Sequence, residues 1–376
     1  MRSFRKYLMC FLTVALYGCV LSLNSCTEKK AEIIKIGAML PLSGDAAQYG
    51  EWGKNGISLA VDEINSKGGI KGNKIEVVYE DDAADPKKGV STVNKLISID
   101  KVKVIIGPIP SAVTLAIAPI CENNKVVVLS SSSNPIITHA GDYIFRNWPS
   151  DDFEGSAMAQ YAIKMKFNNV AVFHINNEYG LGIATVFKEQ YVKLGGSVLI
   201  TEAFMQGGSD MRSLLTKIKS YNPDAIYLIG HTKENGYIVK QARDLGIKTQ
   251  ILGTVGIEGP DFITIASESA EGLVYTAPAF DPDARDPVIN TYQEAYIKKY
   301  GKKSEIFAAT AYDALNIMAL MIQKYGNDPD KIKAGLYALK NYPGVSGVTS
   351  FDENGDVVKP VIFKTVKNKQ YIIIKE

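Results

Sequence analysis

From residue 33 onward, short apolar runs alternate with longer segments whose apolar residues recur at helical spacing. The first run, 33–39, predicts a buried strand. In 50–66 the apolar residues fall at i, i+3, i+4 and i+7, which predicts an amphipathic helix. The alternation continues, with strands predicted at 75–80, 104–106, 126–129, 170–175, 198–203, 225–229 and 250–253, and helices at 86–99, 111–122, 155–166, 183–194, 211–220 and 236–245.

This order predicts βαβ units and parallel sheets. So many strands exceed one comfortable sheet, and Pro149 interrupts the chain before a new helix. We therefore predict an α/β fold of two Rossmann-like lobes with parallel sheets. The C-terminal part departs from the alternation: helices are expected at 288–300 and 308–324, then a hairpin of 348–351 and 360–374 with its turn at 353–355.

The first 25 residues are typical of an export signal: Arg2, Arg5 and Lys6 precede an apolar run. The sequence around Cys26 resembles a bacterial lipobox, whose Cys becomes the acylated first residue, and Cys19 is the rival position. We expect residues 1–25 to be a lipoprotein signal peptide, 26–32 a tether, and the mature chain to be anchored by lipid in the periplasm or cell envelope. An uncleaved N-terminal anchor helix is the alternative.

Composition and motifs exclude several classes of function. Lys and Arg number 42 against 40 Asp and Glu, and this near-neutral balance does not indicate nucleic-acid binding. The chain has no Walker A, HExxH or GxSxG pattern, and its three His are far apart. Asp81, Asp82 and Asp85 are better explained as a loop with a helix cap than as a cation site. We expect no cofactor, no metal ion and no catalysis.

Polar and aromatic residues follow several predicted strands, where ligands bind in doubly wound sheets. Tyr49 follows the first strand, and Tyr179 follows the first strand of the second lobe. Ser111 begins a helix, so its amide and hydroxyl lie at a site that favours anions. Four serines, 130–133, follow a neighbouring strand. Together the serines could form a cradle for a carboxylate, although hydroxyls after a strand can also be ordinary loop chemistry.

Several segments strongly resemble the leucine/isoleucine/valine-binding proteins of bacterial ABC transporters. They are 36–39, 47–50, 65–74 (NSKGGIKGNK), 79–82, 178–180, 241–243 and 268–273. The resemblance implies two Rossmann-like lobes joined by three crossovers that close over a ligand without chemistry. We place lobe 1 at 33–150 plus 280–345 and lobe 2 at 151–279 plus 346–376.

The resemblance also implies the roles of individual residues. Ser111 and Ser133 would bind the ligand carboxylate, and the Ser131 carbonyl would accept from an ammonium. We include Ser132 with this group. Tyr49, Tyr179 and Phe307 would wall the side-chain pocket, and His231 stands where the family often has an aromatic residue.

One departure concerns the ligand. The acid that neutralises an α-ammonium in the family aligns with Val255, which leaves Glu258 or Glu178 as substitutes. On this ground we expect a carboxylate without an α-amino group to bind more tightly than leucine or valine. We expect the ligand to be a branched-chain or aliphatic amino acid or a related organic acid. The chain would be a monomer that delivers it to an ABC permease; a ligand-sensing subunit for a signalling partner is the alternative.

Overall fold

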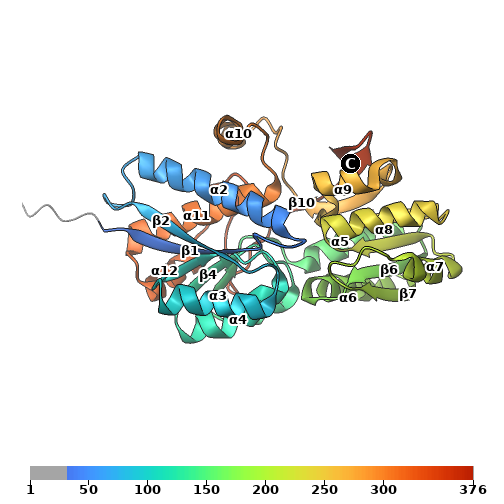
Figure 1. Cartoon of the computed structure of the whole chain (residues 1–376), viewed down its shortest axis with the longest axis horizontal. Helices are drawn as coiled ribbons and strands as arrows, with labels where there is room; N and C mark the ends of the chain where they lie inside the picture. Colours follow the sequence, from blue (N-terminus) through green and yellow to red (C-terminus); the bar gives the residue numbers. More distant parts are fainter. Residues whose placement is uncertain (1–31, 376) are drawn as a thin grey trace, which may run out of the picture.

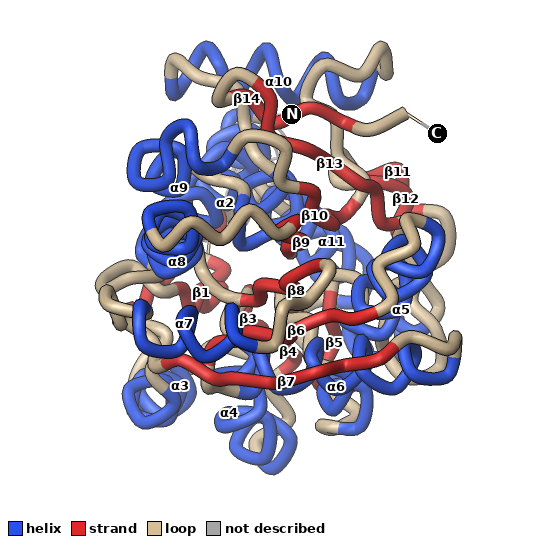
Figure 2. The backbone as a smooth tube through the Cα atoms, turned by 90° about the vertical axis from the view of Figure 1, so that its right-hand side faces the viewer, coloured by secondary structure: helices blue, strands red, loops and turns tan. Residues whose placement is uncertain are grey.

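The computed structural model describes residues 32–375, which form two lobes side by side (Figure 1). The expected signal peptide, Cys19 and Cys26 lie outside the described residues. Each lobe contains a parallel sheet with helices on its faces (Figures 1 and 2). The predicted α/β architecture is confirmed.

The first lobe is built on a five-stranded parallel sheet in the order β2-β1-β3-β4-β5. Its strands are β1 (Ile34–Leu40), β2 (Ile75–Asp81), β3 (Val104–Ile106), β4 (Val127–Ser130) and β5 (Ile144–Arg146). The last five residues of β1 are all buried, as the continuous apolar run predicted. The helices of this lobe are α2 (Ala47–Ser66), α3 (Pro86–Ser98), α4 (Ser111–Asn123), α10 (Pro287–Tyr300), α11 (Ile306–Tyr325) and α12 (Pro329–Tyr337).

The second lobe repeats this order in its parallel strands, β7-β6-β8-β9-β10, and adds two antiparallel strands, β13 and β14, beside β10. The strands are β6 (Asn169–Ile175), β7 (Ser197–Phe204), β8 (Ala225–Ile229), β9 (Gln250–Gly253), β10 (Val274–Pro278), β13 (Val361–Lys367) and β14 (Gln370–Ile373). The helices are α5 (Asp151–Lys164), α6 (Glu178–Lys193), α7 (Arg212–Ser220), α8 (Thr232–Asp244) and α9 (Pro260–Ala266).

Within residues 32–375 the chain passes between the sheets three times: after β5, after β10, and between Val357 and β13. The third passage comes later than the boundary expected at 345/346. Phe351 and Val357 are buried in the same cluster as the first sheet, so residues up to Val357 pack with lobe 1.

The predicted C-terminal hairpin is wrong in its pairing. Residues 353–355 do form a turn, but it joins only an isolated bridge between Phe351 and Val357. The short strand β12 (Gly347–Thr349) pairs instead with β11 (Tyr342–Gly344). The true hairpin is β13–β14, whose turn places Asn368 and Lys369 at positive φ.

Helix α11 is long and apolar enough to cross a membrane by length and composition. Most of it is buried within the first lobe, and it packs closely against α2. Its buried Asp313 accepts hydrogen bonds from the backbone of Val345 and Ser346. The burial of α11 and its packing against α2 explain its apolar sequence as that of a core helix.

Candidate ligand-binding site between the two lobes

Both sheets reverse their strand order at one point, between β1 and β3 in the first lobe and between β6 and β8 in the second. The carboxyl ends of strands at such a reversal are where doubly wound sheets bind ligands. Tyr49 and Ser111 follow β1 and β3, and Tyr179 and His231 follow β6 and β8. The topology therefore brings these four residues to facing edges of the two sheets.

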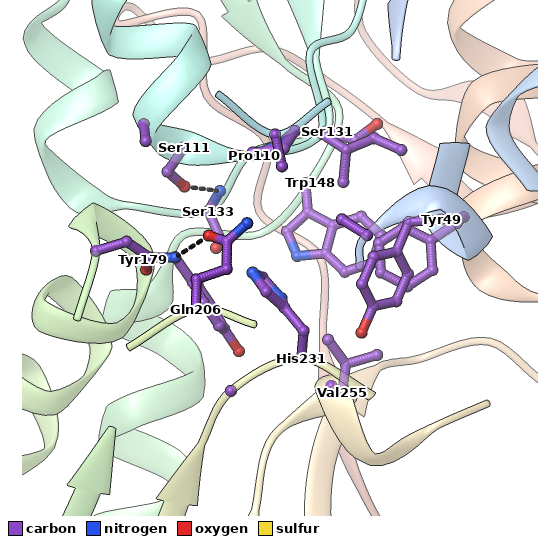
Figure 3. A pocket seen from close by; sticks show the side chains of 18 of the residues that line it. Tyr49, Pro110, Ser111, Ser131, Ser133, Trp148, Tyr179, Gln206, His231 and Val255 are labelled. Atoms are coloured by element: carbon purple, nitrogen blue, oxygen red, sulfur yellow. Dashed lines mark hydrogen bonds between the residues drawn. The ribbon is translucent and has the colours of Figure 1, made fainter. Parts of the chain in front are cut away.

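A cavity of ≈ 60 Å³ lies at this position, lined by residues of both lobes (Figure 3). A water molecule needs about 10–15 Å³ on this measure, so the cavity has room for a small organic molecule. Seven of the nine predicted ligand residues line it: Tyr49, Ser111, Ser131, Ser133, Tyr179, His231 and Phe307. Val255 lines it as well.

The serine side of the cavity is built by the first turn of α4 and the loop after β4. The Ser111 hydroxyl accepts hydrogen bonds from the backbone N–H groups of Ser133 and Asn134, at 3.4 and 3.2 Å. Ser111 and Ala112 both line the cavity at the start of α4, where backbone N–H groups have no partner within the helix. This side of the cavity offers hydrogen-bond donors to an anion, and none of these donors carries a formal positive charge.

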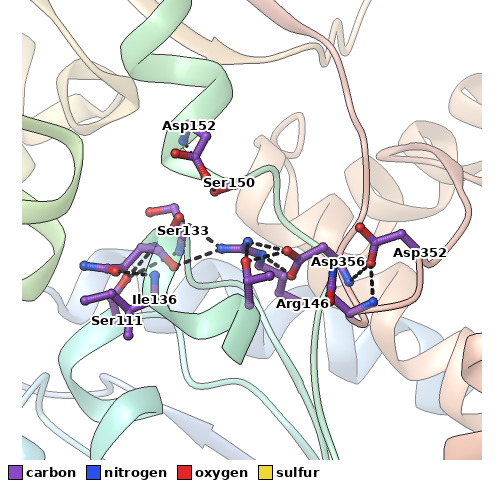
Figure 4. Close-up of polar contacts among 11 residues, drawn as sticks. Ser111, Ser133, Ile136, Arg146, Ser150, Asp152, Asp352 and Asp356 are labelled. Atoms are coloured by element: carbon purple, nitrogen blue, oxygen red, sulfur yellow. Dashed lines mark hydrogen bonds and ion pairs between the residues drawn. The ribbon is translucent and has the colours of Figure 1, made fainter. Parts of the chain in front are cut away.

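A buried arginine holds the serine loop in place (Figure 4). The Arg146 guanidinium, fully buried, donates to the carbonyl of Ser133 at 3.2 Å and that of Asn134 at 2.9 Å. It also pairs with Asp356, with Nε 2.6 Å from Oδ1. Arg146 does not itself line the cavity. Its guanidinium instead binds the serine loop and Asp356.

The opposite side is aromatic. The Phe307 ring stacks on Trp148 at 4.7 Å between centroids and lies 4.7 Å from Tyr49. His231 stacks on Tyr179 at 5.8 Å. Burial lowers the pKa of His231, so this side chain is neutral at pH 7. The wall is therefore suited to an apolar group of a ligand.

Two predicted residues lie elsewhere. Ser132 turns inward, where its hydroxyl lies 2.7 Å from Thr114 Oγ1 and 2.9 Å from the Ile109 carbonyl. Glu258 turns away from the cavity and binds Lys364 at 2.9 Å. Glu178, the other acid considered, is exposed.

The structure adds lining residues that the sequence did not indicate, chiefly Trp148, Glu154, Asn177 and Gln206. Glu154 is an acid, and its Oε1 lies 3.4 Å from the backbone N of Val255. The structure therefore places beside Val255 an acid other than the two substitutes considered from the sequence, Glu258 and Glu178.

The two lobes contact each other across the cavity. Tyr49 Oη lies 2.6 Å from Thr232 Oγ1 and accepts from the Thr232 N–H at 3.2 Å. The Asn134 side chain donates to the Glu178 carbonyl. These hydrogen bonds join the two lobes directly beside the cavity.

Comparison with known proteins agrees with this site. The model of the periplasmic binding protein family matches residues 33–370, and the chain belongs to that family. It is 32% identical over 332 residues to the leucine-, isoleucine-, valine-, threonine- and alanine-binding protein of Pseudomonas aeruginosa, covering 87% of this chain and 88% of the relative. The predicted resemblance is confirmed, and so is the expectation of a binding protein rather than an enzyme.

Two crystal structures are similar over nearly the whole fold. A leucine-binding protein of Thermotoga maritima superposes with a TM-score of 0.86 at 34% identity, covering 91% of this chain and 98% of that one. A branched-chain amino acid transporter substrate-binding protein of Streptococcus pneumoniae, in complex with isoleucine, gives 0.85 at 32%, covering 92% and 100%.

Proposed function

We propose that the chain is the solute-binding subunit of an ABC importer and binds an aliphatic α-amino acid between its lobes. The observation that carries this is the two-sided cavity, in which free N–H groups and hydroxyls face an aromatic wall. A ligand carboxylate would accept from the start of α4 and from Ser133, while its aliphatic side chain would pack among Tyr49, Trp148 and Phe307. The names of the relatives support this ligand class.

Binding would draw on residues of both lobes, so the ligand favours the closed arrangement over an open one. Release would require the three passages between the lobes to act as a hinge. We further propose that the protein acts as a monomer, anchored by lipid at Cys26 and facing the periplasm, where a permease can accept its ligand.

Thermal unfolding of the purified protein with each common amino acid tests the ligand class. Leucine, isoleucine or valine should raise the midpoint, because a ligand at 100 times its Kd stabilises the native state by about 2.7 kcal/mol. Aspartate and lysine are the matched negative controls, since neither side chain suits an aromatic wall. If none of the three aliphatic amino acids raises the midpoint, the proposed ligand class is wrong.

Uptake of labelled leucine by cells lacking this protein separates transport from sensing. Reduced uptake that the restored gene corrects supports the importer. Normal uptake alongside a lost response to leucine would favour the sensory subunit.

A further inference from the structure

Glu154 is the one acidic side chain among the described residues that line the cavity. Glu154 comes from the first turn of α5 and is 3% exposed. Neither Lys nor Arg is found among the described residues that line the cavity, and His231 is neutral. A buried carboxylate without a cation is costly, so it requires either a proton or a positively charged partner.

The hydrogen bonds of Glu154 leave part of its carboxylate available. Oε1 accepts from Thr276 Oγ1 at 2.7 Å and lies 3.4 Å from the Val255 N–H. Within residues 32–375, no group donates a hydrogen bond to Oε2. One oxygen is thus fixed to the sheet edge of the second lobe, and the other remains free.

We propose that Glu154 is the counter-ion for the α-ammonium of the ligand and thereby selects amino acids over simple carboxylic acids. This inference rests on the proposed function, because it assigns a residue to the ammonium of the ligand class named there. The ligand would then span the cavity, with its carboxylate at the serine side and its ammonium at Glu154. Position 255 needs no acidic side chain for this role. The backbone N–H of Val255 instead holds the Glu154 carboxylate, which takes the place of that acid.

The protonation of Glu154 supplies an independent readout. Burial raises the pKa of this carboxyl group to about 7, so without ligand it is half protonated at neutral pH. An ammonium would favour the ionised form, and leucine binding at pH 6 should release close to one proton. A carboxylate lacking the ammonium would favour the protonated form, and its binding at pH 7.5 should take up a proton.

Among the described residues, three other titratable side chains interact electrostatically with Glu154. Asp151 precedes it on α5, and Tyr179 and Tyr227 approach from α6 and β8. Burial raises the pKa of all three. The positive charge of Arg146, which also pairs with Asp356, partly opposes this rise at Asp151. Asp151 and both tyrosines remain in the Glu154→Gln protein. Any proton release that is present in wild type and lost in this variant therefore comes from Glu154.

The experiment is calorimetry of leucine and of its deaminated analogue, 4-methylpentanoate, in two buffers of different ionisation enthalpy. Wild type should prefer leucine and release a proton on binding it. Glu154→Gln, which keeps the acceptor for Thr276, should bind leucine about 100-fold more weakly and bind 4-methylpentanoate as well as wild type or better. Its proton release with leucine should vanish.

Restoring an acid nearby provides a second variant. Adding Val255→Glu to the Glu154→Gln protein should recover much of the leucine preference, because position 255 lines the same part of the cavity. If Glu154→Gln binds leucine with wild-type affinity and proton release, the ammonium role is overturned while the proposed function stands. If wild type prefers 4-methylpentanoate and takes up a proton, Glu154 acts as a neutral acid, and both the assignment and the amino acid ligand are wrong.

Discussion

Tyr49 Oη and Thr232 Oγ1 lie 2.6 Å apart, although they belong to different lobes and are separated by 183 residues in the chain. Both side chains are buried, so neither has water as an alternative partner. Opening the lobes would break this bond and return both groups to solvent. In the proposed hinge motion, this bond would therefore stabilise only the state in which the two lobes are in contact.

Removal of the Tyr49 hydroxyl should favour the open state. In Tyr49→Phe, the loss of a hydrogen bond worth about 0.5–1.5 kcal/mol should weaken leucine binding by up to about tenfold. Small-angle scattering should show a radius of gyration that falls on adding leucine to wild type, and Tyr49→Phe should need more leucine for the same change. Tyr179→Phe is the control for closure, because its hydroxyl bonds Thr254 within the same lobe. A radius of gyration that does not change at saturating leucine would contradict closure by ligand.

The three serines after β4 and at α4 allow a matched comparison. Ser111→Ala and Ser133→Ala should each weaken leucine binding by about 1.5–3 kcal/mol, as expected for hydrogen bonds to a charged carboxylate. Ser132→Ala should leave the affinity nearly unchanged and lower the free energy of unfolding instead, because the Ser132 hydroxyl bonds only groups of the first lobe. Calorimetry and chemical unfolding on the same three variants measure both quantities. Equal losses of affinity in all three would argue against the carboxylate site.

The sequence predicted the fold because the apolar periodicity changes sharply between strands and helices. Its errors at helix starts have a common cause. Helix α6 begins at Glu178 instead of 183, and α8 begins at Thr232 instead of 236. The first turn of α8 is polar, and that of α6 holds Glu178, Gly180 and the exposed Leu181, so in both helices the buried apolar stripe begins about one turn late. The Asn177 side chain, which accepts from the Gly180 N–H, is the local signal for the true start of α6.

The site was predictable where residues directly follow strands at the order reversal, and this rule found Tyr49, Ser111 and Tyr179. It could not separate Ser132 from Ser131 and Ser133, because successive side chains of an extended segment point to opposite sides. Glu154 was missed for a different reason. It follows two aspartates at the start of α5, a pattern typical of solvated acids that complement the helix dipole. Only the packing of α5 against β10 shows that it is buried.

The proposed lipid anchor would be attached at Cys26. If this residue is acylated, Cys26→Ser should release the protein from the membrane fraction or leave its precursor unprocessed, while leucine binding by the soluble form stays unchanged. Fractionation and intact mass measure both effects. Cys19→Ser is the control, and a membrane-bound, fully processed Cys26→Ser protein would assign the anchor to Cys19.

The stability of the ligand-free protein should depend on Glu154 in a definite direction. The pKa of this group is about 7 in the folded state, against about 4.5 when exposed, so between these values the native state binds more protons than the unfolded one. Its contribution to the free energy of unfolding is therefore lost as pH rises from about 4.5 to about 7. Glu154→Gln removes this dependence and should stabilise the protein more at pH 7.5 than at pH 5, by about 2 kcal/mol. Urea unfolding of both proteins at the two pH values measures the difference, and saturating leucine should abolish much of the wild-type penalty at pH 7.5. A difference between the proteins that is the same at both pH values would show that Glu154 is already ionised at pH 5, and that its charge is compensated within the protein itself.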